Sequence, residues 1–164
     1  MRQFYLLFRI ICPIFIGLIL NPHVIMIKEH DTYDYNTVFT EKDAEVYAKL
    51  TDDYNPVHID REYATGTEFG RPVAQGVLIL CAFAKVFGTM WPADRLAYFI
   101  SQNVTYLRPV YIDEPYHIRF ECTSVDHKRM IGTIVGTMRD KDGNSVVITE
   151  ARIFSKEHFS APAM

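Results

Sequence analysis

The densest group of chemically capable side chains lies in the ten residues Thr51–Asp60, TDDYNPVHID. Asp53 and His58 are five residues apart, and Asn55-Pro56 lies between them. Asn-Pro is a strong turn initiator, and the Asn55 side chain can bond backbone groups to hold the turn. Such a turn would bring Asp53 and His58 together. A carboxylate and an imidazole so placed can hold a water and take its proton, which predicts a general-base pair.

The same stretch has two other interpretations. In a structural one, Asp52 or Asp53 caps the end of a helix, Asp60 caps the next helix, and His58 is a surface residue. In a third, Asp53, His58 and Asp60 hold a metal ion, although no second cluster in the sequence supplies further ligands. The residue types alone leave these interpretations open.

A second candidate is the segment Arg71–Gly76, which leads into a strongly apolar stretch. The N-terminus of a helix presents unpaired N–H groups and a partial positive charge. A glycine there lets a ligand oxygen approach the backbone, as in an oxyanion hole for a thioester carbonyl. The alternative is that Gly76 only permits close packing of the helix against a sheet.

Helices and one weak strand must position these residues. Residues 32–39 alternate weakly, as a strand does. Thr40 is a predicted N-cap with Asp43 at the capping-box position, and the helix that follows should end at Pro56. Asp60 is a predicted cap for a short helix, Arg61–Ala64.

Residues 76–88 predict a long buried helix, because Val77–Ala84 is apolar throughout. Four residues at i, i+4 spacing give this helix a mostly small stripe that backbone or a thin ligand could approach: Gly76, Leu80, Ala84 and Gly88. Cys81, in the apolar run, is expected in the core rather than as a nucleophile. Trp91 is expected to be a packing anchor.

The second half predicts four strands rich in Val, Ile, Thr, Tyr and Phe. They are Ala97–Tyr106, Tyr111–Val125, Met130–Met138 and Val146–Ser155, with a hairpin turn at residues 140–144. The order of elements favours an α+β fold in which an antiparallel sheet wraps around one long buried helix. Such a sheet has edge strands, and pairing of two subunits edge to edge commonly covers them.

Composition excludes several functional classes. The chain has 164 residues, with 17 Lys and Arg against 20 Asp and Glu, a formal net charge of −3. This balance argues against nucleic-acid binding. Its three cysteines form no CxxC motif, so neither a zinc framework nor a disulfide scaffold is expected, and a reducing cytoplasm is the predicted location.

No phosphate loop, G-x-S-x-G or HExxH motif is present. His117, His127 and His158 have no acidic or cysteine residue at a recognisable spacing in the sequence.

Residues 1–25 differ from the rest, with two arginines, no acidic residue and an apolar run at Ile10–Leu20. Three explanations are open: a start codon assigned too early, with Met26 as the true start, a signal or membrane anchor, or a real extension. We expect residues 26–164 to form a single domain.

The chain resembles the MaoC-like dehydratases, and among these the (R)-specific enoyl-CoA hydratases. The resemblance lies in residues 47–60, Tyr63-Ala64, residues 69–74 and Gly76, and in Tyr106–Val110, which is similar to the family's aromatic-x-x-Pro-Val strand. It covers roughly residues 40–155, and Asp-x-Asn-Pro-x-His is its specific part. The resemblance implies a hot-dog fold, a homodimer whose two sheets join, and a CoA thioester substrate.

Carried onto this sequence, the resemblance makes Asp53 and His58 the pair that activates water, and Gly76 the donor to the thioester oxygen. Asn55, Gln75 and Ala84 are the expected substrate-binding residues. Gln75 stands where the family usually has histidine, Ala84 where some hydratases carry serine. Asp113-Glu114 replaces the usual Gly-Asp.

The implied reaction is reversible hydration of a trans-2-enoyl-CoA to a 3-hydroxyacyl-CoA, without metal or organic cofactor. Two rival functions are a hot-dog thioesterase, which directs water at the carbonyl carbon, and a non-catalytic acyl-CoA-binding module. The Asp-x-Asn-Pro-x-His stretch favours the hydratase over the thioesterase. Loss of Asp53 or His58 would have marked the binding module, and both are present.

Overall fold

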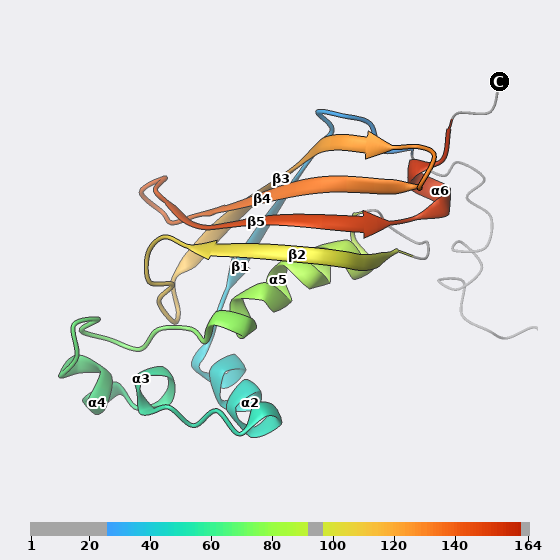
Figure 1. Ribbon diagram of the computed structural model, residues 1–164. Coiled ribbons are helices and arrows are strands. Elements are labelled where there is room, and N and C mark those ends of the chain that lie inside the picture. The colour runs from blue at the N-terminus through green and yellow to red at the C-terminus, as the bar shows by residue number, and fades with distance from the viewer. Residues whose placement is uncertain (1–25, 92–96, 162–164) are drawn as a thin grey trace, which may run out of the picture.

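A five-stranded antiparallel sheet packs against one long helix in the computed structural model, which describes residues 26–91 and 97–161 (Figure 1). The strands are β1 Thr32–Val38, β2 Tyr98–Tyr106, β3 Pro115–Asp126, β4 Ile131–Arg139 and β5 Ser145–Phe154. Their order in the sheet is β1-β3-β4-β5-β2, and every neighbouring pair is antiparallel. The predicted α+β class is confirmed. The expectations for residues 1–25 lie outside the described residues.

The helices are α2 Glu41–Thr51, α3 Pro56–Ile59, α4 Arg61–Thr65, α5 Gly76–Thr89 and α6 Lys156–Phe159. The capping box predicted at α2 is present: the Thr40 hydroxyl accepts from the Asp43 N–H at 3.2 Å, and the Asp43 carboxylate accepts from the Thr40 N–H at 2.9 Å. Figure 1 shows α2, α3 and α4 together on one side of the sheet, at the end where α5 begins. The site predicted from sequence lies in this region.

The core lies between the sheet and one face of α5. Six residues form that face: Leu78, Ile79, Ala82, Phe83, Val86 and Phe87. Phe120 on β3 meets the rings of Phe83 and Phe87 edge-on, with centroids 5.7 and 5.2 Å apart. Gly136 on β4 makes room for Phe83, because a Cβ there would lie 2.8 Å from that ring. Each buried phenylalanine contributes roughly 1.5–3 kcal/mol.

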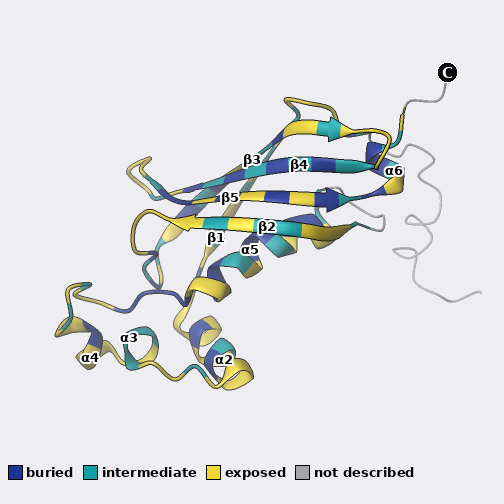
Figure 2. Cartoon of the chain, viewed as in Figure 1, coloured by how far each residue is buried: buried dark blue, intermediate teal, exposed yellow. Residues whose placement is uncertain are grey.

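The opposite face of α5 is open, so the expectation of a helix buried on all sides is wrong for the single chain. Val77 is 58% exposed, and Cys81 is exposed rather than in the core. The physical reason is that the sheet covers one face only, and α2 contacts α5 near its start (Figure 2). Leu80 and Ala84, which belong to the predicted stripe, are half-buried at the border between the two faces.

Several element ends differ from the prediction. The first helix stops at Thr51 and not at Pro56, because Asp52 takes the left-handed conformation at φ 58°. The strand expected from Tyr111 begins at Pro115, since Tyr111 instead forms an isolated bridge with Val73. The remaining helix and strand ends agree with the prediction within one residue.

The short helix α6 was not expected from the sequence. It buries Phe159 against Gly132 on β4, where a Cβ would lie 2.4 Å from the phenylalanine ring. The packing role expected for Trp91 is confirmed, because its ring stacks on Tyr33 with centroids 6.0 Å apart and planes 10° apart.

Candidate active site

The Asn-Pro turn between α2 and α3 is held by local hydrogen bonds. The Asn55 side-chain oxygen accepts from the Val57 N–H at 3.3 Å and so caps α3, with Pro56 in its first turn. The Asn55 N–H donates to the Asp53 carboxylate at 3.4 Å. Residues 56–59 form a short helix directly after the predicted Asn-Pro turn, and His58 lies on this helix. Asn and Asp side chains in turns commonly form such hydrogen bonds with backbone groups two residues further on.

The His58 ring is fixed by one contact with a distant residue. Its Nδ1 lies 2.7 Å from the backbone oxygen of Val73, and the side chain is half-buried. A carbonyl oxygen can only accept, so Nδ1 carries the proton in this bond. The neutral ring then has Nε2 as an open acceptor, which is the form that a general base needs.

Val73 belongs to a segment that joins α3 to the rest of the domain. Its N–H donates to the Val57 oxygen at 3.3 Å, next to the bond with His58. On the other side, the Ala74 N–H donates to the Val110 oxygen at 2.7 Å. The same segment continues into α5 at Gly76, so the position of His58 is tied to the start of that helix through three residues.

Asp53 and His58, both described and both half-buried, make no direct hydrogen bond with each other. One Asp53 oxygen accepts from the Asn55 N–H, which holds the carboxylate on the turn. An ionised carboxylate has room for further donors. The arrangement leaves both side chains with acceptor capacity, and their joint action on a water stays a prediction.

Gly76 opens α5 with its backbone N–H available. Gln75, the N-cap residue, makes no side-chain capping bond, so no side chain caps the first turn among the described residues. The Tyr106 hydroxyl donates to the Gly76 oxygen at 2.7 Å. A Cβ at position 76 would lie only 3.1 Å from that hydroxyl oxygen, so only glycine fits beside Tyr106 without displacement.

Tyr106 was not singled out from sequence, although it opens the aromatic-x-x-Pro-Val segment. Burial raises the pKa of its hydroxyl above the ordinary tyrosine value, and nearby Tyr47 adds to the shift. Tyr106 therefore keeps its proton at neutral pH and remains a donor to Gly76. The aromatic position of the motif was a signal, but its contact with α5 spans 30 residues.

A groove of about 380 Å³ opens beside Gly76. It is lined by Phe69, Val73, Ala74, Gly76, Ile79 and residues 106–110. A larger groove of about 450 Å³, at residues 36–38, 115–117 and 140–141, contains none of the predicted site residues. The smaller groove is mostly apolar and has the open end of α5 at its wall, which suits a ligand with one polar acceptor on an apolar body.

The other predicted residues have separate places. Gln75 is buried and its side-chain amide donates to the Ala44 oxygen of α2 at 3.1 Å, which ties α2 to the start of α5. Ala84 is half-buried two turns further along α5. Asp60 caps α4, accepting from the Tyr63 N–H at 3.0 Å, as the structural interpretation expected. Substrate binding by Asn55, Gln75 and Ala84 stays a prediction.

Asp113 and Glu114, which replace the family's usual Gly-Asp, both form ion pairs. Arg71 donates to Glu114 at 2.7 Å and lies 4.0 Å above the Tyr111 ring, and Arg61 donates to Asp113 at 3.2 Å. The hydrogen bond from Arg71 is the main reason that the pKa of Glu114 lies below its ordinary value. These pairs join the segment before β3 to the segments around α4.

Within residues 26–91 and 97–161, no three His, Cys, Asp or Glu side chains gather in a way that could hold a metal ion. In the same ranges, no helix has the length and apolar character needed to cross a membrane. His117, which had no evident partner in the sequence, has its Nε2 3.0 Å from the Asp34 carboxylate on the neighbouring strand.

Comparison with known proteins adds a family. A family model described as "MaoC like domain" matches residues 26–144. The chain is 26% identical over 113 residues to an (R)-specific enoyl-CoA hydratase of Aeromonas caviae, covering 69% of this chain and 84% of that one. It is 29% identical over 89 residues to a mitochondrial 3-hydroxyacyl-[acyl-carrier-protein] dehydratase of Arabidopsis thaliana, covering 54% of this chain and 52% of that one.

Among solved structures, an R-hydratase from Pseudomonas aeruginosa in the unliganded form matches with a TM-score of 0.75 at 22% identity. The match covers 84% of this chain and 92% of that chain. The fold is therefore the hot-dog fold that the sequence resemblance implied, with the sheet wrapped around α5.

Proposed function

We propose, because the chain belongs to the MaoC-like domain family, that it adds water reversibly to a trans-2-enoyl-CoA and gives the 3-hydroxyacyl-CoA. The observation that carries the proposal is the bond between His58 Nδ1 and the Val73 oxygen. It leaves Nε2 as an acceptor beside the Asp53 turn, and it ties that acceptor to the segment that leads to Gly76. The related hydratase and dehydratase sequences support a carbon–oxygen lyase.

In the proposed reaction, one water donates one hydrogen bond to the Asp53 carboxylate and another to His58 Nε2. The water oxygen attacks C3 of the enoyl thioester while one proton passes to this pair, and the electron pair of the double bond moves to the thioester oxygen. The Gly76 N–H stabilises the resulting enolate oxygen. Protonation of C2 by the same pair completes the addition and restores both groups.

We also propose that the protein is a homodimer that pairs along β2. This strand lies at the edge of the sheet, and its exposed side includes Tyr98, Phe99 and Ile100. An exposed edge strand with large apolar side chains is a template for pairing with another chain. A second copy would cover this edge.

The free thiols of Cys81 and Cys122 accord with the reducing cytoplasm that is proposed as the location of the protein.

The test uses crotonyl-CoA and two readouts on the same sample. A hydratase lowers the ultraviolet absorbance of the conjugated thioester and forms 3-hydroxybutyryl-CoA without release of free thiol. A thioesterase releases free CoA, which a thiol reagent detects. A non-catalytic binding module gives neither signal, so either of the last two results contradicts the proposal.

A further inference from the structure

The groove of about 380 Å³ beside Gly76 is called the first groove below. Another groove, of about 250 Å³ and called the second groove, adjoins it. Arg108 and Pro109 line both grooves and so form the ridge between them. The first groove is mostly apolar, whereas the second is lined by the charged residues Arg71, Arg108, Glu114, Asp140, Lys141 and Asp142. A ligand whose thioester lies at Gly76 and which continues past Arg108 would meet charged groups.

The cations of the second groove differ in how far they are already engaged. Arg71 is held by Glu114 at 2.7 Å and by the Tyr111 ring, and Lys141 lies 3.8 Å from the same Glu114 carboxylate. Arg108 is exposed, and its guanidinium makes no hydrogen bond or close ion pair within residues 26–91 and 97–161. Of the three, Arg108 is therefore the one whose donors are open to a ligand.

Arg108 interacts with Asp140 through its charge, without a hydrogen bond between the two. The Asp140 carboxylate is already used in the β4–β5 turn, where one oxygen accepts from the N–H groups of Asp142 and Asn144 at 3.0 and 2.8 Å. It therefore has less capacity to draw the arginine away from a ligand.

We propose that Arg108 binds a phosphate group on the carrier of the acyl chain. The inference rests on the proposed function, since it takes the thioester to lie at Gly76. A guanidinium matches phosphate oxygens with two parallel N–H donors, and it keeps its charge at every physiological pH. Arg108 occupies the second x position of the aromatic-x-x-Pro-Val segment, so the motif itself does not require an arginine there.

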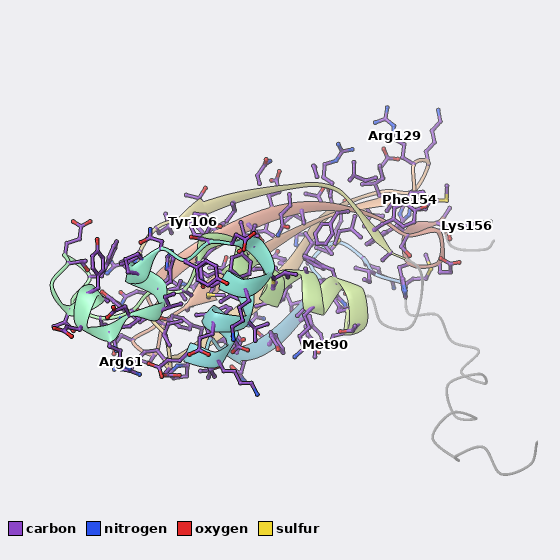
Figure 3. All side chains as sticks on the ribbon, turned by 90° about the horizontal axis from the view of Figure 1, so that it is seen from below. Arg61, Met90, Tyr106, Arg129, Phe154 and Lys156 are labelled. Atoms are coloured by element: carbon purple, nitrogen blue, oxygen red, sulfur yellow. The ribbon has the colours of Figure 1, made fainter. Side chains whose placement is uncertain are left out.

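A phosphate of this kind has two sources: CoA, or the phosphopantetheine arm of an acyl carrier protein. The test compares four crotonyl thioesters that differ only in the carrier: N-acetylcysteamine, pantetheine, 4′-phosphopantetheine and CoA. The first two have no phosphate. Steady-state hydration of each is measured for the wild type, Arg108→Ala and Arg108→Lys. Arg129→Ala is the control, because Arg129 is an exposed arginine at the opposite end of the sheet from Tyr106 (Figure 3).

We expect Arg108→Ala to raise KM about five- to tenfold for the phosphate-bearing thioesters, with kcat unchanged, because a charge-assisted bond made equally in ground and transition states is lost. KM for the two phosphate-free thioesters should not change, Arg108→Lys should recover part of the loss, and Arg129→Ala should behave as wild type. An effect shared by CoA and phosphopantetheine places the contact at their common phosphate. An effect on CoA alone places it on the nucleotide.

The proposal is overturned if Arg108→Ala changes KM equally with and without phosphate, since Arg108 would then only shape the groove. It is also overturned if KM changes for none of the four. Failure of the proposed reaction is a different result, in which the wild type hydrates no thioester. Calorimetric titration with CoA and with pantetheine then decides the role of Arg108 without turnover: weaker CoA binding in Arg108→Ala supports it, and unchanged CoA binding contradicts it.

Discussion

Single hydrogen bonds hold the groups that the proposed hydration needs. Val73 fixes the tautomer of His58, Asn55 holds the Asp53 carboxylate, and Tyr106 fixes the oxygen of Gly76. Each of these hydrogen bonds positions a neighbouring group. The Tyr106 hydroxyl is the most informative of the three, because it can be removed without changing the size of the ring.

Tyr106→Phe should lower kcat several-fold and leave KM nearly unchanged. The lost hydrogen bond is worth about 0.5–1.5 kcal/mol, and it steadies the first turn of α5, whose Gly76 N–H is proposed to stabilise an oxyanion formed only in the transition state. The matched control is Tyr33→Phe on β1, outside the proposed dimer edge, where the ring stacks on Trp91 with centroids 6.0 Å apart. Equal kcat in both variants and the wild type would show that Tyr106 does not position Gly76.

At the scale of elements, the turn between α2 and α3 links stability to chemistry. Asn55 caps α3, which carries His58, whereas Thr40 caps α2, which carries none of the predicted site residues. The two caps make the same kind of bond at comparable exposure, so they form a matched pair of sites for substitution.

Asn55→Ala and Thr40→Ala should each lower the free energy of unfolding by about 0.5–2 kcal/mol, measured by urea denaturation. Only Asn55→Ala should also reduce hydration of crotonyl-CoA strongly, because it removes the side-chain cap from the start of α3, the helix that carries His58. Thr40→Ala should stay close to wild-type turnover. If the two variants lose activity to the same degree, the Asn55 turn has no special part in the site.

Elements set by local sequence were predictable, and contacts between distant segments were not. The capping box at Thr40 and the turn at 140–144 depend on neighbouring residues, and both are present. The Asp-x-Asn-Pro-x-His stretch indicated the candidate site for the same reason. The bond from His58 to Val73 and that from Tyr106 to Gly76 join segments 15 and 30 residues apart, and no local pattern specifies them.

The open face of α5 illustrates the same limit. An apolar run predicts burial, yet it cannot say what covers each side of the helix. In the single chain, the sheet covers one face and Cys81 is left exposed on the other. The strand order β1-β3-β4-β5-β2 was equally out of reach, because β2 and β3 are consecutive in sequence but lie apart in the sheet.

At the scale of the whole molecule, the proposed assembly along β2 rests on the unpaired edge of that strand. Ile100→Lys places a charge on that edge, at a residue 48% exposed in the single chain, and should shift the protein from dimer to monomer at micromolar concentration. Light scattering coupled to size-exclusion chromatography measures the change.

The control for this prediction is Val46→Lys, because Val46 is 56% exposed on α2 and lies outside the edge strand. It should remain dimeric. A wild-type protein that is monomeric and active, or a dimer unaffected by Ile100→Lys, would rule out pairing through β2.

The central claim is that Asp53 and His58 act together on one water, and the most direct measurement is turnover of crotonyl-CoA by Asp53→Asn, His58→Gln and the double variant. General-base catalysis contributes about 10²–10⁴-fold, so each single change should lower kcat at least about a hundredfold. The double variant should be little worse than the worse single one, because groups acting on one water are not additive. Thermal unfolding should change little, since the turn lies outside the core. Near-native hydration by either single variant would contradict the account.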